Sequence, residues 1–231
     1  MFNIKGFQPC SLVDYPGNIA ATIFLGGCNF RCHYCHNPEL VLAPGKIEPI
    51  DEEVVIEYLK KRKGMLDGVV ITGGEPCLSV GVIDLIKAIK EIGLLVKLDT
   101  NGTHPEVLEK ALPLVDYVAM DIKSSLERYE EVCGTRVDTD NILKSIQLIR
   151  ERAIDYEFRT TMVRSYVAED DIDKICSWLD GSKKYAIQQF KKDGPMINED
   201  VCEEILYSKE ELQCFADKCG KHFDIIEVRN I

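Results

Sequence analysis

Runs of apolar, often β-branched residues recur along the chain, and most are followed by a segment with helical periodicity. Near-continuous apolar strands that alternate with amphipathic helices are typical of a parallel sheet covered by helices. The pattern predicts an α/β protein. We expect strands at residues 19–25, 68–72, 94–99, 117–122, 157–163, 185–190 and 223–228.

Polar residues mark the starts of the helices between these strands. Asp51 can cap a helix that carries Val55 on its apolar face, and Ser79 can cap one that carries Ile86. Ser208 can cap a final helix before the last strand. The polar segment at 191–201 is expected to form a loop.

Unusual polar residues follow the strands at their carboxyl ends. They fall at residues 73–75, 99–102, 121–123 and 188–189. An open doubly wound sheet would scatter these positions, whereas a barrel would bring them to one rim, where active sites of such folds lie. The positions therefore favour a single-domain partial (β/α)6 TIM-like barrel with mostly parallel strands and outer helices.

Length and charge narrow the classes of function. The 231 residues, 45% of them apolar, suffice for one core and suggest one domain over 1–231. A net charge of −11 argues against nucleic acid and anionic membranes as partners. No apolar stretch is long enough to cross a membrane, and the first residues do not resemble a signal peptide, so we expect a cytoplasmic protein. The ten cysteines are then expected to be free thiols.

The sharpest signal is the spacing CxxxCxxC formed by Cys28, Cys32 and Cys35 in the loop after the first expected strand. Three thiolates this close can hold a cubane iron–sulfur cluster and leave one iron open to a reactant. Three alternatives compete with this interpretation. They are a zinc site completed by His36, a c-type haem attachment through CxxCH, and three cysteines buried in the core.

The spacing CxxxCxxC, with Tyr34 before its last cysteine, resembles the cluster motif of radical S-adenosylmethionine (SAM) enzymes. The segment Gly73-Gly74-Glu75-Pro76 resembles the GGE motif of that superfamily. Asp14-Tyr15-Pro16-Gly17, Asp99-Thr100-Asn101-Gly102 and Asp121-Ile122-Lys123 are similar to segments of glycyl-radical enzyme activating enzymes. Residues 6–17 and 27–32 are most similar to activators of anaerobic ribonucleoside-triphosphate reductase. The similarity runs from residue 6 to about 190 and weakens afterwards. We expect a domain core at about 15–190 and an extension at about 191–231.

This resemblance implies a [4Fe–4S] cluster on the three cysteines and SAM on its fourth iron. It implies an oxidoreductase that cleaves SAM to a 5′-deoxyadenosyl radical, which takes hydrogen from a glycine of a partner enzyme. An alternative within the superfamily is chemistry on a small molecule, as in 7-carboxy-7-deazaguanine synthase. The remaining cysteines show no second cluster spacing, so an external flavodoxin or ferredoxin is expected to supply the electron.

The resemblance also implies roles for individual residues. Asp14 would lie near the incoming glycine, and Lys123 would contact the cofactor. Arg159 lies within an expected buried strand, and from that position we predict that it meets an anion or an acid inside the cavity. A monovalent cation would lie near the methionine carboxylate, held by Asp99, Thr100, Met120 and Asp121. The remaining cofactor contacts would be Tyr34, His36, Gly73, Gly74, Glu75, Asn101 and Gln189.

Overall fold

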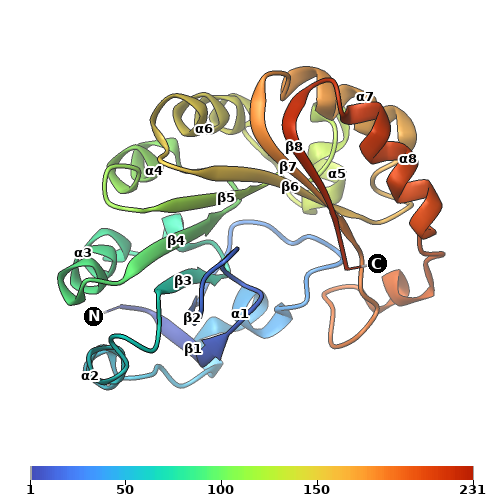
Figure 1. The fold of residues 1–231 in the computed structure, drawn as a ribbon. Helices are drawn as coiled ribbons and strands as arrows, with labels where there is room; N and C mark the ends of the chain where they lie inside the picture. Colours follow the sequence, from blue (N-terminus) through green and yellow to red (C-terminus); the bar gives the residue numbers. More distant parts are fainter. Residues whose placement is uncertain (1, 231) are drawn as a thin grey trace.

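Eight strands form one sheet in this computed structural model, which describes residues 2–230 (Figure 1). Neighbours in the sheet follow the order of the chain, from β1 at one edge to β8 at the other. Within the described residues no pairing joins β8 to β1, so the curved sheet is an open barrel. The strands are β1 (Ile4–Ser11), β2 (Ala20–Leu25), β3 (Gly68–Gly73), β4 (Leu95–Thr100), β5 (Tyr117–Asp121), β6 (Tyr156–Met162), β7 (Ser182–Gln189) and β8 (Phe223–Arg229).

The helices are α1 (Pro38–Leu42), α2 (Glu52–Lys61), α3 (Val82–Ile92), α4 (Pro105–Ala111), α5 (Tyr129–Cys133), α6 (Thr139–Arg152), α7 (Glu169–Trp178) and α8 (Lys209–Cys219). Most of them cover the convex outer side of the sheet (Figure 1), whereas Val41 of α1 lines an internal cavity. Short 3-10 turns are η1 (Pro44–Lys46), η2 (Pro76–Leu78), η3 (Leu126–Arg128) and η4 (Glu199–Glu203). The predicted α/β fold, a partial and mostly parallel barrel with outer helices, is confirmed.

The caps agree with the sequence at two of three helices. Asp51 accepts a hydrogen bond from the amide of Glu53, and Ser208 accepts one from the amide of Glu211. The prediction for Ser79 was wrong, because α3 begins after Gly81, whose φ of +90° lies in the left-handed region. No helix within residues 2–230 has the length and apolar character needed to cross a membrane.

The sequence did not indicate β1, which is the one antiparallel neighbour of β2. Its sequence contains Gly6 and Pro9, and its pairing with β2 shifts register between Gln8 and Ser11. Proline cannot donate to a neighbouring strand and is tolerated at the edge of a sheet. An irregular edge strand of this kind lacks the apolar run by which the other strands were predicted.

Alternate residues of each parallel strand face two different environments. Val96 and Leu98 of β4 are buried in the main core beneath the helices. Tyr117 and Ala119 of β5 instead face the barrel interior, where they form a second small core with Tyr15. Side chains at every second position therefore share the interior of the barrel.

One group of interior charges, which we call the lower network, surrounds Glu157 near the start of β6. The Glu157 carboxylate is 1% exposed and accepts hydrogen bonds from Arg229 at 2.8 and 2.6 Å and from the Tyr117 hydroxyl at 2.8 Å. Lys184 completes the group through Glu227, at 2.8 Å. Burial opposes the charged form of Glu157, but Arg229 outweighs it, and the pKa of Glu157 is lowered.

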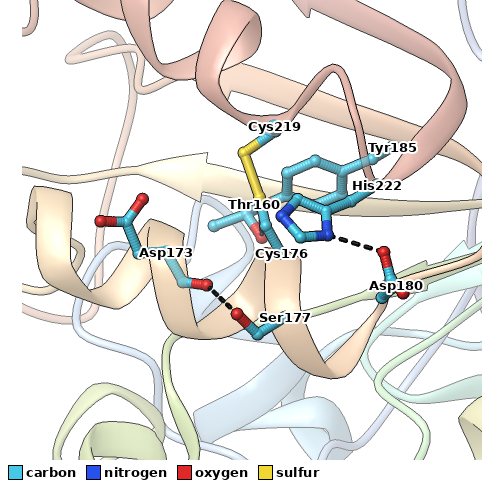
Figure 2. Close-up of a disulfide and its surroundings, with 8 residues drawn as sticks. All are labelled: Thr160, Asp173, Cys176, Ser177, Asp180, Tyr185, Cys219 and His222. Atoms are coloured by element: carbon cyan, nitrogen blue, oxygen red, sulfur yellow. Dashed lines mark hydrogen bonds and ion pairs between the residues drawn. A yellow bond between two sulfur atoms is a disulfide. The ribbon is translucent and has the colours of Figure 1, made fainter.

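A disulfide joins Cys176 of α7 to Cys219 of α8, with 5.8 Å between their Cα atoms (Figure 2). The expectation that all cysteines are free was therefore wrong for this pair. Figure 2 shows the bond between the two helices, with Tyr185 among the residues around it. Since the pair is separated by 43 residues, the disulfide fastens the last helix to the body of the barrel.

Candidate active site

The three predicted cluster cysteines lie on the loop between β2 and α1 and line a cavity of about 390 Å³. The loop is held by its own backbone and by Arg31. The Arg31 guanidinium donates hydrogen bonds to the carbonyls of Cys28 and Phe30, each at 2.7 Å. The amide of Cys35 donates to the carbonyl of Cys32 at 3.0 Å. These contacts fix the three thiols on one wall of the cavity.

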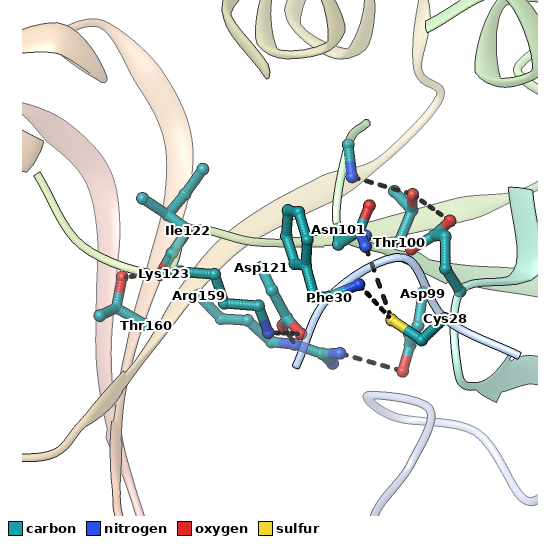
Figure 3. A network of polar contacts seen from close by, with 12 residues as sticks. Cys28, Phe30, Asp99, Thr100, Asn101, Asp121, Ile122, Lys123, Arg159 and Thr160 are labelled. Atoms are coloured by element: carbon teal, nitrogen blue, oxygen red, sulfur yellow. Dashed lines mark hydrogen bonds and ion pairs between the residues drawn. The ribbon is translucent and has the colours of Figure 1, made fainter. Parts of the chain in front are cut away.

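The sulfur atoms differ in their surroundings. Cys28 Sγ accepts hydrogen bonds from the amide of Phe30 at 3.4 Å and from Asn101 Nδ2 at 3.9 Å (Figure 3). Burial nevertheless raises the pKa of the Cys28 thiol to about 12. A hydrogen bond with the thiol of Cys133 lowers the pKa of Cys32 to about 7. Donors near a cluster ligand are among the groups that tune the potential of an iron–sulfur cluster.

The two glycines at the end of β3 allow the cluster loop to approach. A Cβ on Gly74 would lie 1.9 Å from the carbonyl oxygen of Gly27. Gly73 has a φ of +121°, and a Cβ there would lie 2.4 Å from the carbonyl oxygen of Leu25. Both glycines also line the cavity. Any side chain at these positions would push the loop away from β3.

Glu75 is 1% exposed and fastens the end of β3 to the end of β4. Its Oε1 accepts hydrogen bonds from the amide of Cys77 at 2.9 Å and from the Thr100 hydroxyl at 2.8 Å. Its Oε2 accepts one from the amide of Asn101 at 2.6 Å. Burial raises the pKa of Glu75. Although Glu75 lines the cavity, its oxygens are engaged within the protein, so it positions Thr100 and Asn101.

Five charged side chains from β4, β5 and β6 form what we call the charge row: Lys97, Asp99, Arg159, Asp121 and Lys123. Lys97 Nζ lies 2.5 Å from Asp99 Oδ1, and Arg159 Nη2 lies 3.1 Å from Asp99 Oδ2. Arg159 Nε also donates to Asp121 Oδ1, and Lys123 Nζ lies 2.9 Å from Asp121 Oδ2. Figure 3 shows Arg159 between the two carboxylates. The sequence-based expectation that Arg159 meets an acid inside the barrel is confirmed.

Arg159 and Lys123 keep the row charged despite its burial. Burial disfavours the charged form of Asp121, but the two cations hold its pKa below the usual range. Burial likewise disfavours charged Lys123 and Arg159, yet Asp121 raises the pKa of both. Since three cations face two carboxylates, one positive charge of the row is left for an anionic group in the cavity.

The oxygens expected to hold a monovalent cation do not fit that role. Both oxygens of Asp99 and both of Asp121 already accept hydrogen bonds from cationic side chains. The Thr100 hydroxyl donates to Glu75. The side chain of Met120 belongs to the core beneath the helices, so only its backbone carbonyl could contribute an oxygen. The two carboxylates implied by the resemblance are already paired with cations of the chain.

Aromatic side chains form part of the cavity wall beside the cluster cysteines, because Tyr34 and His36 belong to the same loop. The rings of Tyr34 and Phe190 meet edge to face with centroids 6.3 Å apart, and His36 lies 5.8 Å from Phe190. Two buried polar atoms in the lining, Tyr34 Oη and Gln189 Oε1, have no hydrogen-bond partner in the protein. Orphaned polar atoms are costly in a finished protein interior, so they indicate a polar ligand at this wall.

The structure brings nearly all predicted site residues together in one cavity. The lining includes Cys28, Cys32, Tyr34, Cys35, His36, Gly73, Gly74, Glu75, Asp99, Thr100, Asn101, Asp121, Lys123, Arg159 and Gln189. Asp14 and Met120 are not part of it. Asp14 instead accepts a hydrogen bond from the Thr22 hydroxyl at 2.7 Å. The next residue, Tyr15, packs in the second small core.

Several interior residues were missed by the sequence analysis, and three of them bear on the chemistry of the site. Thr161 and Asn230 line the cavity, and Lys97 lies beside Asp99. Thr161 follows Arg159 by two positions and Lys97 precedes Asp99 by two, so the period of a strand could have indicated both. Asn230, with a φ of +63°, follows the last strand, where no motif draws attention to it.

Comparison with known proteins agrees with this geometry. The family described as the radical SAM superfamily matches residues 22–179. The chain belongs to the radical SAM superfamily and is homologous to glycyl-radical enzyme activating enzymes. A relative from Methanocaldococcus jannaschii, named "Putative glycyl-radical enzyme activating enzyme MJ1227", is 36% identical over 237 residues, which cover 99% of this chain and 96% of that protein.

Two further proteins show how far the similarity in sequence and in fold extends. Pyruvate formate-lyase 1-activating enzyme of Escherichia coli K12 is 30% identical over 176 residues, covering 73% of this chain and 70% of that enzyme. The crystal structure of Streptococcus suis SuiB bound to S-adenosylmethionine has a TM-score of 0.65 at 13% identity. The match covers 88% of this chain and 48% of SuiB, and at this identity it concerns the fold alone.

Membership of the superfamily implies a [4Fe–4S] cluster and SAM, and the residues present fit both. Three thiols from a single short loop face a cavity that also holds unpaired polar atoms and the cationic side chains of Lys123 and Arg159. Within residues 2–230 no three His, Cys, Asp or Glu side chains converge as ligands of a single metal ion would. Membership of the superfamily favours a cluster on the three cysteines over the zinc alternative.

Proposed function

We propose that this protein uses a 5′-deoxyadenosyl radical to remove a hydrogen atom from the Cα of a glycine in a partner glycyl-radical enzyme. The observation that carries the proposal is the single cavity in which three cysteine thiols face a row of charges with one surplus cation. Homology to activating enzymes over 99% of the chain supports the choice of a protein substrate.

Different residues of the chain would hold the cluster and SAM. Cys28, Cys32 and Cys35 would hold the cluster, which with SAM supplies a one-electron cleavage to the radical and methionine. Lys123 and Arg159, which line the cavity, would bind the methionine carboxylate, because they carry the surplus positive charge of the row.

The aromatic wall would hold the nucleoside part of SAM. Tyr34 Oη can donate a hydrogen bond and Gln189 Oε1 can accept one, which suits the amino and hydroxyl groups of adenosine. The surrounding rings exclude water from the place where the radical forms.

The partner that we propose is anaerobic ribonucleoside-triphosphate reductase. The support is the likeness of residues 6–17 and of the cluster loop to activators of that reductase. A flavodoxin or ferredoxin would supply the electron, since the chain has one cluster motif and no inserted ferredoxin-like segment between that motif and α2. Residues 1–231 would act as one radical SAM domain.

The test is anaerobic. The protein is reconstituted with iron and sulfide, reduced and given SAM, and 5′-deoxyadenosine is measured together with an electron paramagnetic resonance spectrum. Cys32→Ala is expected to abolish cleavage, because Cys32 lies on the cavity wall. Cys214→Ala is the matched control, because Cys214 is an exposed free cysteine on α8.

A glycyl radical signal that requires both this protein and the candidate reductase would support the partner. Cleavage without a glycyl signal on the reductase or on pyruvate formate-lyase, but with turnover of a small molecule, would overturn the activase and favour the small-molecule alternative. A loaded cluster that neither binds nor cleaves SAM would overturn the whole proposal.

A further inference from the structure

Lys97 is an unusual residue for the centre of a parallel strand. It is 2% exposed, and its neighbours Val96 and Leu98 are buried on the other face of β4. A buried lysine is costly unless its ammonium is paired. The pairing partner here is Asp99, two positions further along the same face.

The contact joins Lys97 to the cavity without exposing it there. Lys97 Nζ lies 2.5 Å from Asp99 Oδ1, whereas the cavity lining includes Asp99 but not Lys97. Arg159 takes the other oxygen of Asp99 at 3.1 Å (Figure 3). Lys97 is therefore a positioning residue that acts on the cavity through Asp99.

We propose that Lys97 supplies, from within the protein, the positive charge that a monovalent cation would otherwise bring to Asp99, so that SAM binds without a bound Na⁺ or K⁺. The ammonium of Lys97 and the guanidinium of Arg159 already pair with both oxygens of Asp99, and their charges repel a further cation at the same carboxylate. The inference rests on the SAM site of the proposed function but is independent of its glycyl-radical partner.

The charge balance shows why this lysine matters. Without Lys97, the carboxylates of Asp99 and Asp121 would face only Arg159 and Lys123, and the row would have no surplus charge. With Lys97 the row keeps one positive charge for an anion. Lys97 therefore determines whether the row can attract the methionine carboxylate unaided.

The test compares cations at equal ionic strength. SAM affinity of the reconstituted protein and the melting temperature of the cluster-free protein are measured in potassium, sodium and tetramethylammonium chloride. For the native protein we expect the SAM affinities in the three salts to agree within about twofold, and the melting temperatures in the three salts to be equal. For Lys97→Met we expect affinity at least tenfold weaker in tetramethylammonium, with recovery and a rise in melting temperature in potassium or sodium.

Two variants serve as controls. Lys97→Arg keeps a cation beside Asp99 and is expected to stay indifferent to the salt. Lys184→Met removes another interior lysine, from the lower network, and its partner Glu227 retains Arg229 at 2.6 Å. It can lower stability but should show no selective response to potassium or sodium.

A saturable response of the native protein to potassium or sodium, but not to tetramethylammonium, would overturn the inference even if Lys97→Met fails to fold. A folded Lys97→Met that shows no cation response would overturn it as well. If SAM does not bind in any salt, the proposed function fails, and the melting temperatures of the cluster-free protein still decide the role of Lys97.

Discussion

Two groups of charges lie inside the same barrel and differ in balance. In the lower network, two cations meet two carboxylates, and the central one, Glu157, also receives the Tyr117 hydroxyl. In the charge row, three cations meet two carboxylates, and four of the five side chains line the cavity. The first group is complete within the protein, whereas the second lacks one anion.

The difference separates stability from binding. A balanced buried network holds strands in place, and breaking it leaves a charge that nothing outside the protein can satisfy. The charge row, which has more cations than carboxylates, gains a partner for its remaining positive charge only when an anionic ligand binds in the cavity. We therefore expect changes in the lower network to affect unfolding, and changes in the charge row to affect SAM.

The largest effect is expected from Arg159→Met. The variant should fold, because Asp99 keeps Lys97 and Asp121 keeps Lys123. SAM affinity should fall by roughly a thousandfold, since the guanidinium that faces the ligand is lost. Equilibrium dialysis with the reconstituted protein measures the affinity for SAM. The affinity of Arg159→Lys should lie between those of the native protein and Arg159→Met. An unchanged affinity would break the distinction between the two groups.

Reduction of the disulfide should lower stability and leave the cavity unchanged. A bond that closes 43 residues contributes about 3 kcal/mol to the free energy of unfolding. Urea unfolding with and without a thiol reagent measures this difference, and Cys219→Ser should match the reduced protein. Cys214→Ser is the control. A parallel loss of SAM affinity would show that the attachment of α8 also shapes the cavity.

Arg229→Met should destabilise the folded protein by about 2 kcal/mol, because Glu157 loses its main partner but keeps the Tyr117 hydroxyl. The affinity of the folded, reconstituted variant for SAM should equal that of the native protein. Urea unfolding and equilibrium dialysis on the same preparation compare the two effects. Loss of affinity without loss of stability would reverse the assignment of the two groups.

The smallest effect concerns pH. Arg229 holds the pKa of Glu157 below its ordinary value of 4.5. A lowered folded-state pKa contributes stability that is complete above about pH 4.5 and is lost as the pH falls toward the folded value. Urea unfolding of the cluster-free protein between pH 6 and pH 3 should show this loss, and Glu157→Gln should show a shallower one. If stability falls with pH equally steeply in the native protein and in Glu157→Gln, the lowered pKa of Glu157 is contradicted.

Part of the site could be predicted from sequence because its chemistry is local. Cys28, Cys32 and Cys35 belong to one loop, and Gly73 and Gly74 are required where two backbones meet. Loops at the carboxyl ends of parallel strands converge whatever the details of packing. These residues could therefore be predicted from the order and the direction of the strands alone.

Lys97 and the disulfide could not be predicted in the same way. A lysine between Val96 and Leu98 suggests a solvent-facing position until the curvature of the sheet encloses its inner side. Cys176 and Cys219 meet only because α7 and α8 pack together, which no spacing reveals. The side chain of Met120 does not line the cavity for a related reason, since it lies on the outer face of β5.

Asn230 follows the last strand and contributes to the wall of the cavity. A fluorescent label attached at this residue would occupy part of the cavity wall. Such an addition would compete with ligands and partners for the same opening. Labels for experiments on this protein are therefore better placed on the outer helices, for example at the exposed Cys214 of α8.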